Sequence, residues 1–267
     1  MKAVTVVIPT SDRPVELKRA LLSVLKQTYR NFVVVVVGNN SKDPDSLRLV
    51  CEEVDKNKVQ FVYLKKCSNA NVARNFGAQY AKSDLIAYLD SDDEWECEHL
   101  TNSVKALEDN KAVFVYGATK IFDGYNYKVK QSRCISEDEH PIDFLLGFNR
   151  GYAQTSSYLI KTDYCNKISW DETLHRHQDY DFFVRVTLAY KSACNSSPDV
   201  VIHWQKGVKR NFNKASVDIF LSKYSSMMSY KTFLRYIGLM IWASLRNLEV
   251  NRVIYFIKQF FNYILKK

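Results

Sequence analysis

The sequence predicts an α/β fold built on a doubly wound, mostly parallel sheet. Short apolar runs alternate four times with helical patterns in residues 1 to 95, and the second run contains five consecutive valines, Val33 to Val37. A strand this uniformly apolar is typical of a parallel sheet that helices cover on both faces. Such sheets bind ligands at the carboxyl ends of their strands, so the residues at those ends are the first candidates for a site.

The predicted elements follow one another closely along the chain. The first strand, Val4 to Thr10, contains Pro9, and Ser11 or Asp12 is a candidate cap for the next helix. Further apolar runs predict strands over residues 33 to 37, 59 to 64 and 85 to 89. Apolar residues at helical spacing mark the helices: Leu17, Ala20, Leu21, Val24 and Leu25; Leu47, Val50, Cys51 and Val54; residues 72 to 80; and Leu100, Val104 and Leu107.

An acidic segment, Asp90-Ser91-Asp92-Asp93, follows the strand over residues 85 to 89. In an extended chain Asp90 and Asp92 point to one side and Ser91 to the other. Two carboxylates on one side suit a divalent metal, which in turn would bind a nucleotide diphosphate. The alternative is that Asp92 or Asp93 caps the following helix.

A second acidic segment lies within residues 174 to 185. If this segment is helical, Asp179 shares a face with Phe182 and points inward. Asp181 lies four residues before Arg185, which predicts an ion pair at the surface. Asp179 is therefore the better candidate for a general base, and the alternative is a helix cap or a buried hydrogen-bond acceptor.

Four segments resemble, in order and at the usual spacing, the pattern of family 2 inverting glycosyltransferases of the GT-A fold. They are Val6 to Thr10, Ser23 to Tyr29, Ala73 to Gly77 and Leu89 to Asp93. The resemblance covers roughly the first 200 residues, and it implies a Rossmann-like GT-A domain. It also implies that a sugar passes from a nucleotide diphosphate to an acceptor hydroxyl, with inversion at the anomeric carbon and with Mn²⁺ or Mg²⁺ as cofactor.

The resemblance implies roles for individual residues of the nucleotide site. Asp90, Ser91 and Asp92 match the metal-diphosphate motif, with Asp92 as the direct metal ligand and Asp90 beside the ribose or a metal-bound water. Thr10 and Arg74 match positions that contact uridine in relatives. The alternative for Arg74 is a solvated position near the start of a helix.

The resemblance also implies the catalytic base and a basic loop. Asp179 matches the aspartate that removes the proton from the attacking hydroxyl. His203 and the basic residues Lys206, Lys209 and Arg210 fall where relatives have a loop that closes over the diphosphate. Cations there would offset the charge of the departing group. The alternative is a solvated basic loop, with His203 in the core.

One departure from the family pattern concerns the nucleotide base. Relatives usually carry two aspartates, Gly and Ser after the second strand, whereas this chain has Gly38-Asn39-Asn40-Ser41. The amide oxygen of Asn39 can still accept a hydrogen bond from uracil N3-H, although without charge assistance. The predicted donor is therefore a UDP-sugar, with a GDP-sugar as the alternative.

The basic excess of the chain is concentrated near its end. The formal net charge is +9, and residues 204 to 267 contain 12 Lys and Arg against Asp218 and Glu249. Apolar residues repeat at helical spacing between Val250 and Ile264, which predicts a basic amphipathic helical appendage that lies on an anionic leaflet. The alternative is that these helices pack on the preceding domain.

The predicted organisation is a catalytic domain over residues 1–203, with a nucleotide half over 1–95 and an acceptor half over 96–203, followed by the appendage over 204–267. Six cysteines lack paired spacing and the first apolar run is a short strand, so we expect no signal peptide and a cytoplasmic location. The spacing of His and Cys argues against a zinc site.

The sequence thus predicts a metal-dependent inverting hexosyltransferase on the inner face of the cell membrane. By resemblance, its acceptor is a polyprenyl-diphosphate-linked saccharide of O-antigen or capsule assembly. A basic nucleic-acid-binding protein is the alternative from another class, but no nucleic-acid-binding motif is present. Asp90, Asp92, Arg74 and Asp179 together argue against an inactive scaffold of the same fold.

Overall fold

The computed structural model describes residues 1–204 and 212–266 and confirms the predicted α/β class. Four parallel strands form one half of the sheet in the order β3-β2-β1-β4. The other half is mixed and continues from β4 in the order β8-β6-β9-β5, with β7 paired to β6. The bounds are β1 (Val4–Thr10), β2 (Phe32–Asn39), β3 (Val59–Leu64), β4 (Leu85–Tyr88), β5 (Glu94–Trp95), β6 (Phe114–Phe122), β7 (Tyr127–Lys130), β8 (Leu159–Lys161) and β9 (Ser192–His203).

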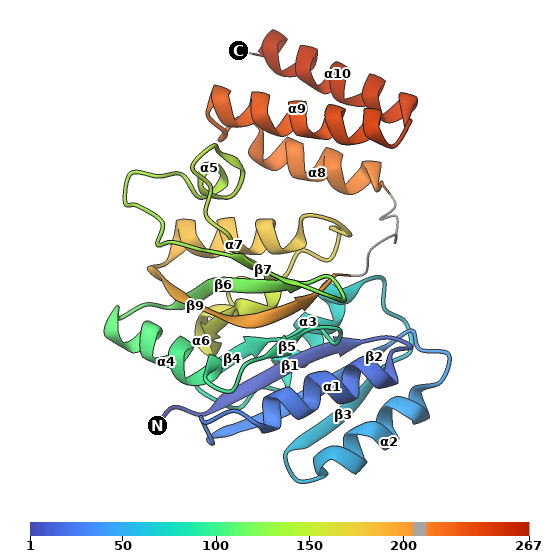
Figure 1. The fold of residues 1–267 in the computed structure, drawn as a ribbon, viewed down its shortest axis with the longest axis vertical. Helices are drawn as coiled ribbons and strands as arrows, with labels where there is room; N and C mark the ends of the chain where they lie inside the picture. The colour runs from blue at the N-terminus through green and yellow to red at the C-terminus, as the bar shows by residue number, and fades with distance from the viewer. Residues whose placement is uncertain (205–211, 267) are drawn as a thin grey trace.

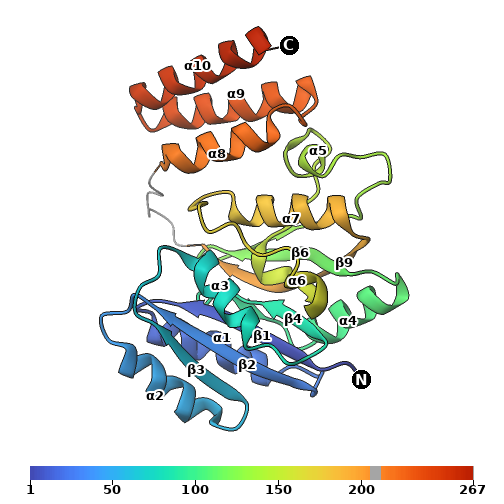
Figure 2. The same ribbon diagram turned by 180° about the vertical axis from the view of Figure 1, so that it is seen from behind.

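Helices cover both faces of the sheet because its strands are apolar on both sides (Figures 1 and 2). In β1, Val4 and Val6 belong to one hydrophobic cluster and Val7 to another, as the alternation of a strand requires. The first cluster includes α1 (Pro14–Leu25), α2 (Pro44–Asp55) and α4 (His99–Asp109). Helices on the other side include α3 (Ala70–Gln79), α5 (Pro141–Leu146), α6 (Thr162–Cys165) and α7 (Gln178–Ala189).

The last three helices form a further layer beyond α7 (Figure 1). They are α8 (Lys214–Tyr224), α9 (Tyr230–Arg246) and α10 (Val250–Lys266). Their buried residues Phe220, Tyr236 and Phe256 belong to the same hydrophobic cluster as Phe182 of α7. The helices therefore pack on the preceding domain along one side, and the division at residue 203 stays a prediction.

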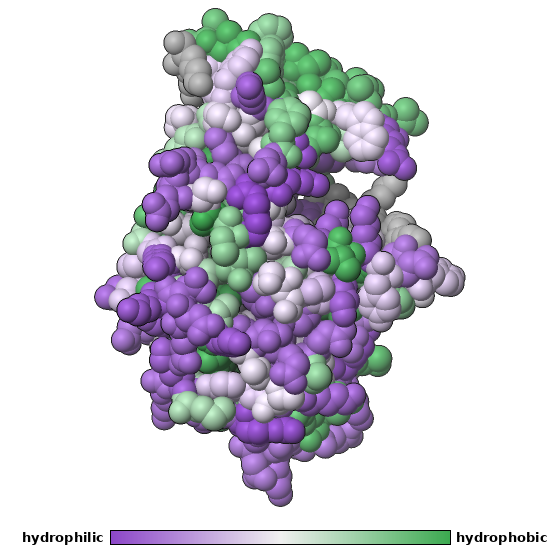
Figure 3. All heavy atoms as spheres, turned by 60° about the vertical axis from the view of Figure 1, so that its left-hand side comes forward, coloured by the Kyte–Doolittle hydropathy of each residue, from purple (hydrophilic) through white to green (hydrophobic). Residues whose placement is uncertain are grey.

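This packing buries only part of the apolar surface of the last two helices. On α10, Val250, Ile254, Ile257 and Phe261 are exposed and spaced to share one face of the helix. Figure 3 shows apolar residues gathered at the end of the molecule that α9 and α10 form. Within the described residues, no helix is both long enough and apolar enough to cross a membrane.

Two predicted helix caps are absent from the structure. Helix α4 begins at His99 after Glu98, so neither Asp92 nor Asp93 caps it. The cap position of α1 is Arg13, and Asp12, at φ 48°, instead accepts hydrogen bonds from the Ser41 hydroxyl and the Lys42 backbone amide, both at 2.7 Å. Asp12 thereby joins the carboxyl ends of β1 and β2.

Candidate active site

A cavity of about 910 Å³ lies where the ends of β4 and β9 meet α7 and the last helices. It brings together five of the predicted site residues, Arg74, Asp90, Asp92, Asp179 and His203, which all line it. The cavity is therefore the candidate active site.

Asp92 lies at this cavity with its side chain 37% exposed. The chain turns here, with the Asp93 backbone amide donating to the Asp90 carbonyl at 3.0 Å, so the extended conformation expected for Asp90 to Asp92 is wrong. Its carboxylate forms an ion pair of 2.5 Å with Arg13, and its backbone carbonyl accepts a hydrogen bond of 2.6 Å from Arg19. Arg13, directly before α1, and Arg19, in the second turn of α1, thus hold the acidic segment in place. Neither contact was predicted from the sequence.

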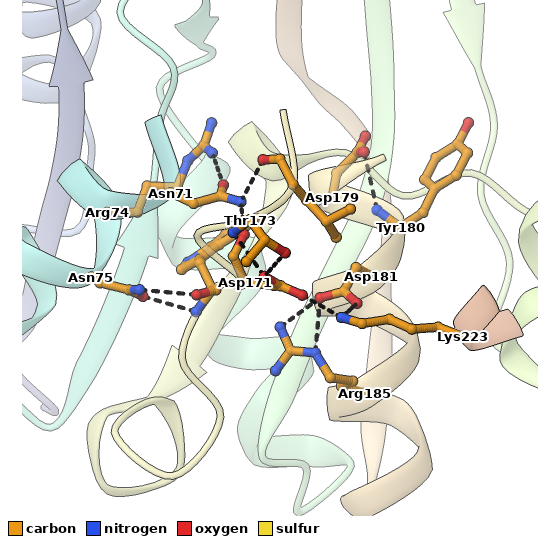
Figure 4. Close-up of polar contacts among 12 residues, drawn as sticks. Asn71, Arg74, Asn75, Asp171, Thr173, Asp179, Tyr180, Asp181, Arg185 and Lys223 are labelled. Carbon is orange, nitrogen blue, oxygen red and sulfur yellow. Dashed lines mark hydrogen bonds and ion pairs between the residues drawn. The ribbon is translucent and has the colours of Figure 1, made fainter. Parts of the chain in front are cut away.

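Asp90 pairs with Arg74 at 2.6 Å. Arg74 is buried, its guanidinium lies 4.6 Å from the centre of the Trp170 ring, and it also donates to Asn71 (Figure 4). The alternative of a solvated arginine is therefore wrong, because α3 directs this side chain into the protein. The predicted contact of Arg74 with uridine stays a prediction.

Asp93 is the third carboxylate of the segment and is buried. Burial raises its pKa well above the usual range, and the charges of Asp90 and Asp92 raise it further. The Ser156 hydroxyl donates to it at 2.6 Å and the backbone amide of His203 donates at 3.3 Å. The raised pKa favours the protonated form of Asp93, and this form limits the repulsion within the acidic segment.

Asp179 lies in the first turn of α7 and is half-buried in the cavity wall. Burial raises its pKa to about 6, although the backbone N–H of Tyr180, which donates to its carboxylate at 3.0 Å, and the charge of Arg74 both favour the ionised form. His177 occupies the cap position of the helix, so the cap alternative for Asp179 is wrong. Its carboxylate is free of ion pairs within residues 1–204 and 212–266.

Asp181 corrects one prediction. It does pair with Arg185, at 2.7 Å, but its side chain is only 1% exposed, so the pair is not on the surface. Lys223 of α8 also pairs with it, at 2.9 Å (Figure 4). The Tyr224 hydroxyl donates to it at 2.7 Å. The sequence pattern missed this burial because the covering helix, α8, comes about 40 residues later in the chain.

Thr10 and Asn39, which were predicted to contact the uridine together with Arg74, lie at the ends of β1 and β2, outside the cavity lining. Thr10 is buried opposite Gly38, and its hydroxyl has no hydrogen-bond partner in the part of the chain that the structure describes. Asn39 is half-buried at the end of β2, and Ser91 is buried. Lys209 lies outside the described residues, as do Lys206 and Arg210.

His203, at the end of β9, is partly buried and lines the cavity. Its ring nitrogen Nε2 lies 2.5 Å from the carboxylate of Glu94. The alternative of a core histidine is therefore wrong, because the ring reaches the cavity edge beside the acidic segment.

The oxygen donors present suit Mg²⁺ or Mn²⁺ only in combination with a substrate. Asp90 and Asp92 are partly exposed to the cavity and offer hard oxygen ligands. Among the described residues, no group of three or more His, Cys, Asp and Glu side chains is arranged to hold a metal. Since Mg²⁺ is usually held by one or two carboxylates together with substrate phosphates, this set fits a metal that binds with the nucleotide.

Several side chains around the cavity were not predicted. Arg13 pairs with Asp92 across 79 positions of the chain, and Ser156 donates to Asp93 across 63. Trp170 lies beneath Arg74. No local pattern marks these residues, because each acquires its role from a distant partner.

The chain belongs to glycosyl transferase family 2, whose model matches residues 5–167. It is 30% identical over 203 residues to the amylovoran biosynthesis glycosyltransferase AmsB of Erwinia amylovora, a match that covers 73% of this chain and 67% of AmsB. It is 28% identical over 120 residues to the Escherichia coli UDP-Glc:alpha-D-GlcNAc-diphosphoundecaprenol beta-1,3-glucosyltransferase WfgD, covering 45% of this chain and 47% of WfgD. An uncharacterised glycosyltransferase of Rickettsia bellii is 28% identical over 190 residues, but the chain spans only 27% of its length.

Solved structures show the same fold at low identity. The crystal structure of S. aureus TarS 1-349 in complex with UDP-GlcNAc matches 97% of this chain and 73% of the TarS chain, with a TM-score of 0.63 and 17% identity. Together with the family match, this likeness confirms the predicted GT-A fold. The chain is thus a family 2 glycosyltransferase, and the family match favours an enzyme over a nucleic-acid-binding protein.

Proposed function

We propose that this glycosyltransferase is a metal-dependent inverting enzyme, which transfers a hexose from a UDP-sugar to a hydroxyl of a lipid-diphosphate-linked saccharide. The observation that carries the proposal is the position of Asp179. Its half-buried carboxylate, with the pKa raised to about 6, lines the same cavity as Asp90 and Asp92. A proton acceptor and an acidic nucleotide-binding segment in one cavity are the two groups that such a transfer requires.

Asp179 acts as the general base. A carboxylate with a pKa of about 6 is ionised at neutral pH, and it is more basic than an exposed aspartate. It takes the proton from the acceptor hydroxyl as that oxygen attacks the anomeric carbon. The Tyr180 backbone amide, which donates to the Asp179 carboxylate, fixes the direction from which the base approaches.

Asp92 would hold Mn²⁺ or Mg²⁺ directly, with Asp90 beside it. When bound, the metal neutralises negative charge on the leaving diphosphate. Arg13 holds the Asp92 carboxylate and Arg74 holds the Asp90 carboxylate, so both carboxylates are oriented before substrate arrives. His203 lies on the same edge, next to the buried Asp93.

The decisive experiment is a screen of nucleotide sugars for metal-dependent hydrolysis by the purified chain. We expect hydrolysis with a UDP-sugar and Mn²⁺, loss with EDTA, and loss in Asp92→Ala. The matched control is Asp109→Ala, an exposed aspartate at the end of α4, which should hydrolyse the donor like wild type. Activity that persists both in EDTA and in Asp92→Ala contradicts the metal proposal.

The choice of uridine rests on Thr10 and Asn39. The buried Thr10 hydroxyl, unpartnered within the described residues, lies at the strand ends where the base is expected. We expect UDP to compete with the donor far better than GDP, and Asn39→Asp to bind UDP as well or more tightly, because a carboxylate strengthens the contact to uracil N3-H. Stronger inhibition by GDP contradicts the assignment.

The acceptor class and the location at the inner face of the membrane have two supports. AmsB and WfgD are named for amylovoran biosynthesis and for a diphosphoundecaprenol-linked acceptor. In this chain, α10 carries an exposed apolar face that includes Ile254 and Phe261, and such a face binds an anionic leaflet by burying apolar area.

Point variants test membrane binding better than a truncation, because α10 also supplies the buried Phe256 and Tyr263 to the core. We expect Ile254→Ser/Phe261→Ser to lose co-flotation with phosphatidylglycerol vesicles. The control Leu49→Ser removes an exposed leucine from α2 and should float like wild type. If Ile254→Ser/Phe261→Ser floats with the vesicles as well as Leu49→Ser does, the membrane proposal is contradicted.

A further inference from the structure

A second set of residues that line the cavity is basic. Lys128 and Lys130 are two positions apart on β7, so they point to the same side of the strand, and both line the cavity. Arg150 comes from the loop after α5 and Arg235 from α9. We call these four residues the cation cluster.

No carboxylate of the described residues forms an ion pair with any of the four members of the cation cluster. Burial lowers the pKa of Lys130, and the charges of Lys128 and Arg150 lower it further. The pKa of Arg235 is likewise lowered by burial and then by Arg150. These cations are therefore close enough to repel one another, and a bound polyanion would relieve that repulsion.

An apolar stripe leads away from the cation cluster along α9. Arg235, Leu239, Trp242 and Arg246 follow one another at intervals of four, three and four residues, so they share one face of the helix. Leu239 lines the cavity and is 40% exposed, and Trp242 is 58% exposed. The guanidinium of Arg246 lies 5.5 Å from the centre of a Trp242 ring. The surface next to the cluster thus changes from cationic to apolar along α9.

We propose that the cation cluster binds the diphosphate of the lipid-linked acceptor and that the lipid chain leaves the cavity along Leu239 and Trp242. This inference rests on the proposed function, because the acceptor sugar attached to that diphosphate must reach Asp179 in the same cavity. Charge-assisted hydrogen bonds from Lys and Arg are the usual way to bind such phosphates. The donor diphosphate, by contrast, is assigned to the acidic segment and its metal.

Binding of farnesyl diphosphate to the purified chain in EDTA tests this subsite without any transfer reaction. Calorimetry should show saturable binding of farnesyl diphosphate, weaker binding of inorganic diphosphate, and none of farnesol. Lys128→Ala/Arg150→Ala should weaken the binding of farnesyl diphosphate at least about tenfold, because charge-assisted hydrogen bonds to the diphosphate are lost. Lys231→Ala, an exposed cation of α9 outside the cavity lining, is the matched control and should bind like wild type.

A second pair of variants separates the lipid from the phosphate. Leu239→Ser/Trp242→Ser should weaken the binding of farnesyl diphosphate several-fold. It should leave the binding of inorganic diphosphate unchanged, because only the farnesyl chain contacts the apolar stripe. If the double cation variant fails to fold, Arg235→Gln carries the same expectation as that variant.

The inference is overturned if the cation variants bind farnesyl diphosphate like wild type. It is also overturned if their affinity for UDP in the presence of Mn²⁺ falls to the same extent, because the cluster would then bind the donor. Its failure is distinguishable from that of the proposed function. Donor hydrolysis without binding of farnesyl diphosphate rejects only the subsite. Binding that depends on the cation cluster, without hydrolysis of any nucleotide sugar, rejects only the proposed reaction.

Discussion

Helix α7 carries two aspartates, one on each side, and their surroundings are opposite in kind. On the cavity side, Asp179 has no ion pair within the described residues and its pKa is raised to about 6. On the side that faces α8, Asp181 is paired with Arg185 and Lys223 and accepts a hydrogen bond from Tyr224. The first carboxylate is left able to take up a proton, and the second is held as a structural anion.

Helix geometry explains how two residues so close in sequence reach such different surroundings. Residues two apart on an α-helix lie about 200° apart around its axis. Asp179 therefore faces the cavity while Asp181 faces the core between α7 and α8. Partner charges, rather than burial alone, therefore distinguish the reactive carboxylate from the structural one.

The largest expected effect is on the structural side. Asp181→Asn should lower the free energy of unfolding by ~2–3 kcal/mol, because Arg185 and Lys223 both lose the buried carboxylate that holds α8 to α7, whereas Lys223 keeps its ion pair with Asp171. Urea denaturation followed by circular dichroism measures this. A loss below ~1 kcal/mol would mean that the pair behaves like a surface pair, as the sequence had predicted.

Asp179→Asn should leave the fold and UDP binding intact and lower turnover by roughly a hundredfold or more, the scale for losing a positioned proton acceptor. Steady-state kinetics and calorimetry measure the two quantities. The amide matches the carboxylate in shape, so a large drop in stability would instead assign Asp179 a structural role. An active Asp179→Asn with an inactive but folded Asp181→Asn would reverse the assignment of the base.

The pH dependence of kcat/KM should show an acidic limb near pH 6. Because the pKa of Asp179 is raised to about 6, the base is ionised above that pH and protonated below it. Activity should therefore rise with pH through 6 and fall about tenfold for each unit below it. The residual activity of Asp179→Asn should lack this limb, and a limb that persists there identifies another titrating group.

The smallest expected effect comes from an exposed pair on α8. Lys214 pairs with Asp218 at 2.7 Å, but the lysine side chain is 65% exposed. Lys214→Ala should lower the free energy of unfolding by less than ~1 kcal/mol, as exposed pairs usually do. The same urea titration measures it, and a loss as large as that of Asp181→Asn would show that burial does not separate the two ion pairs.

Most of the local elements, and the strand end that carries the acidic segment, were predictable from the sequence alone. The five valines predicted a strand covered on both faces, which is β2, and the acidic segment was expected at a strand end, where Asp90 and Asp92 lie. The 3.6-residue period likewise predicted that Phe182 of α7 is buried. These features were predictable because hydrophobic period and strand alternation depend only on neighbouring residues.

The partners of these residues depend on how distant elements pack together. Asp181 is buried because α8 packs on α7, and Asp92 is paired because Arg13 lies beside the end of β4. The cation cluster likewise forms only when β7, the loop after α5 and α9 meet at one cavity. The physical reason is that burial and ion pairing depend on which distant elements dock together, and no local period in the sequence records that docking.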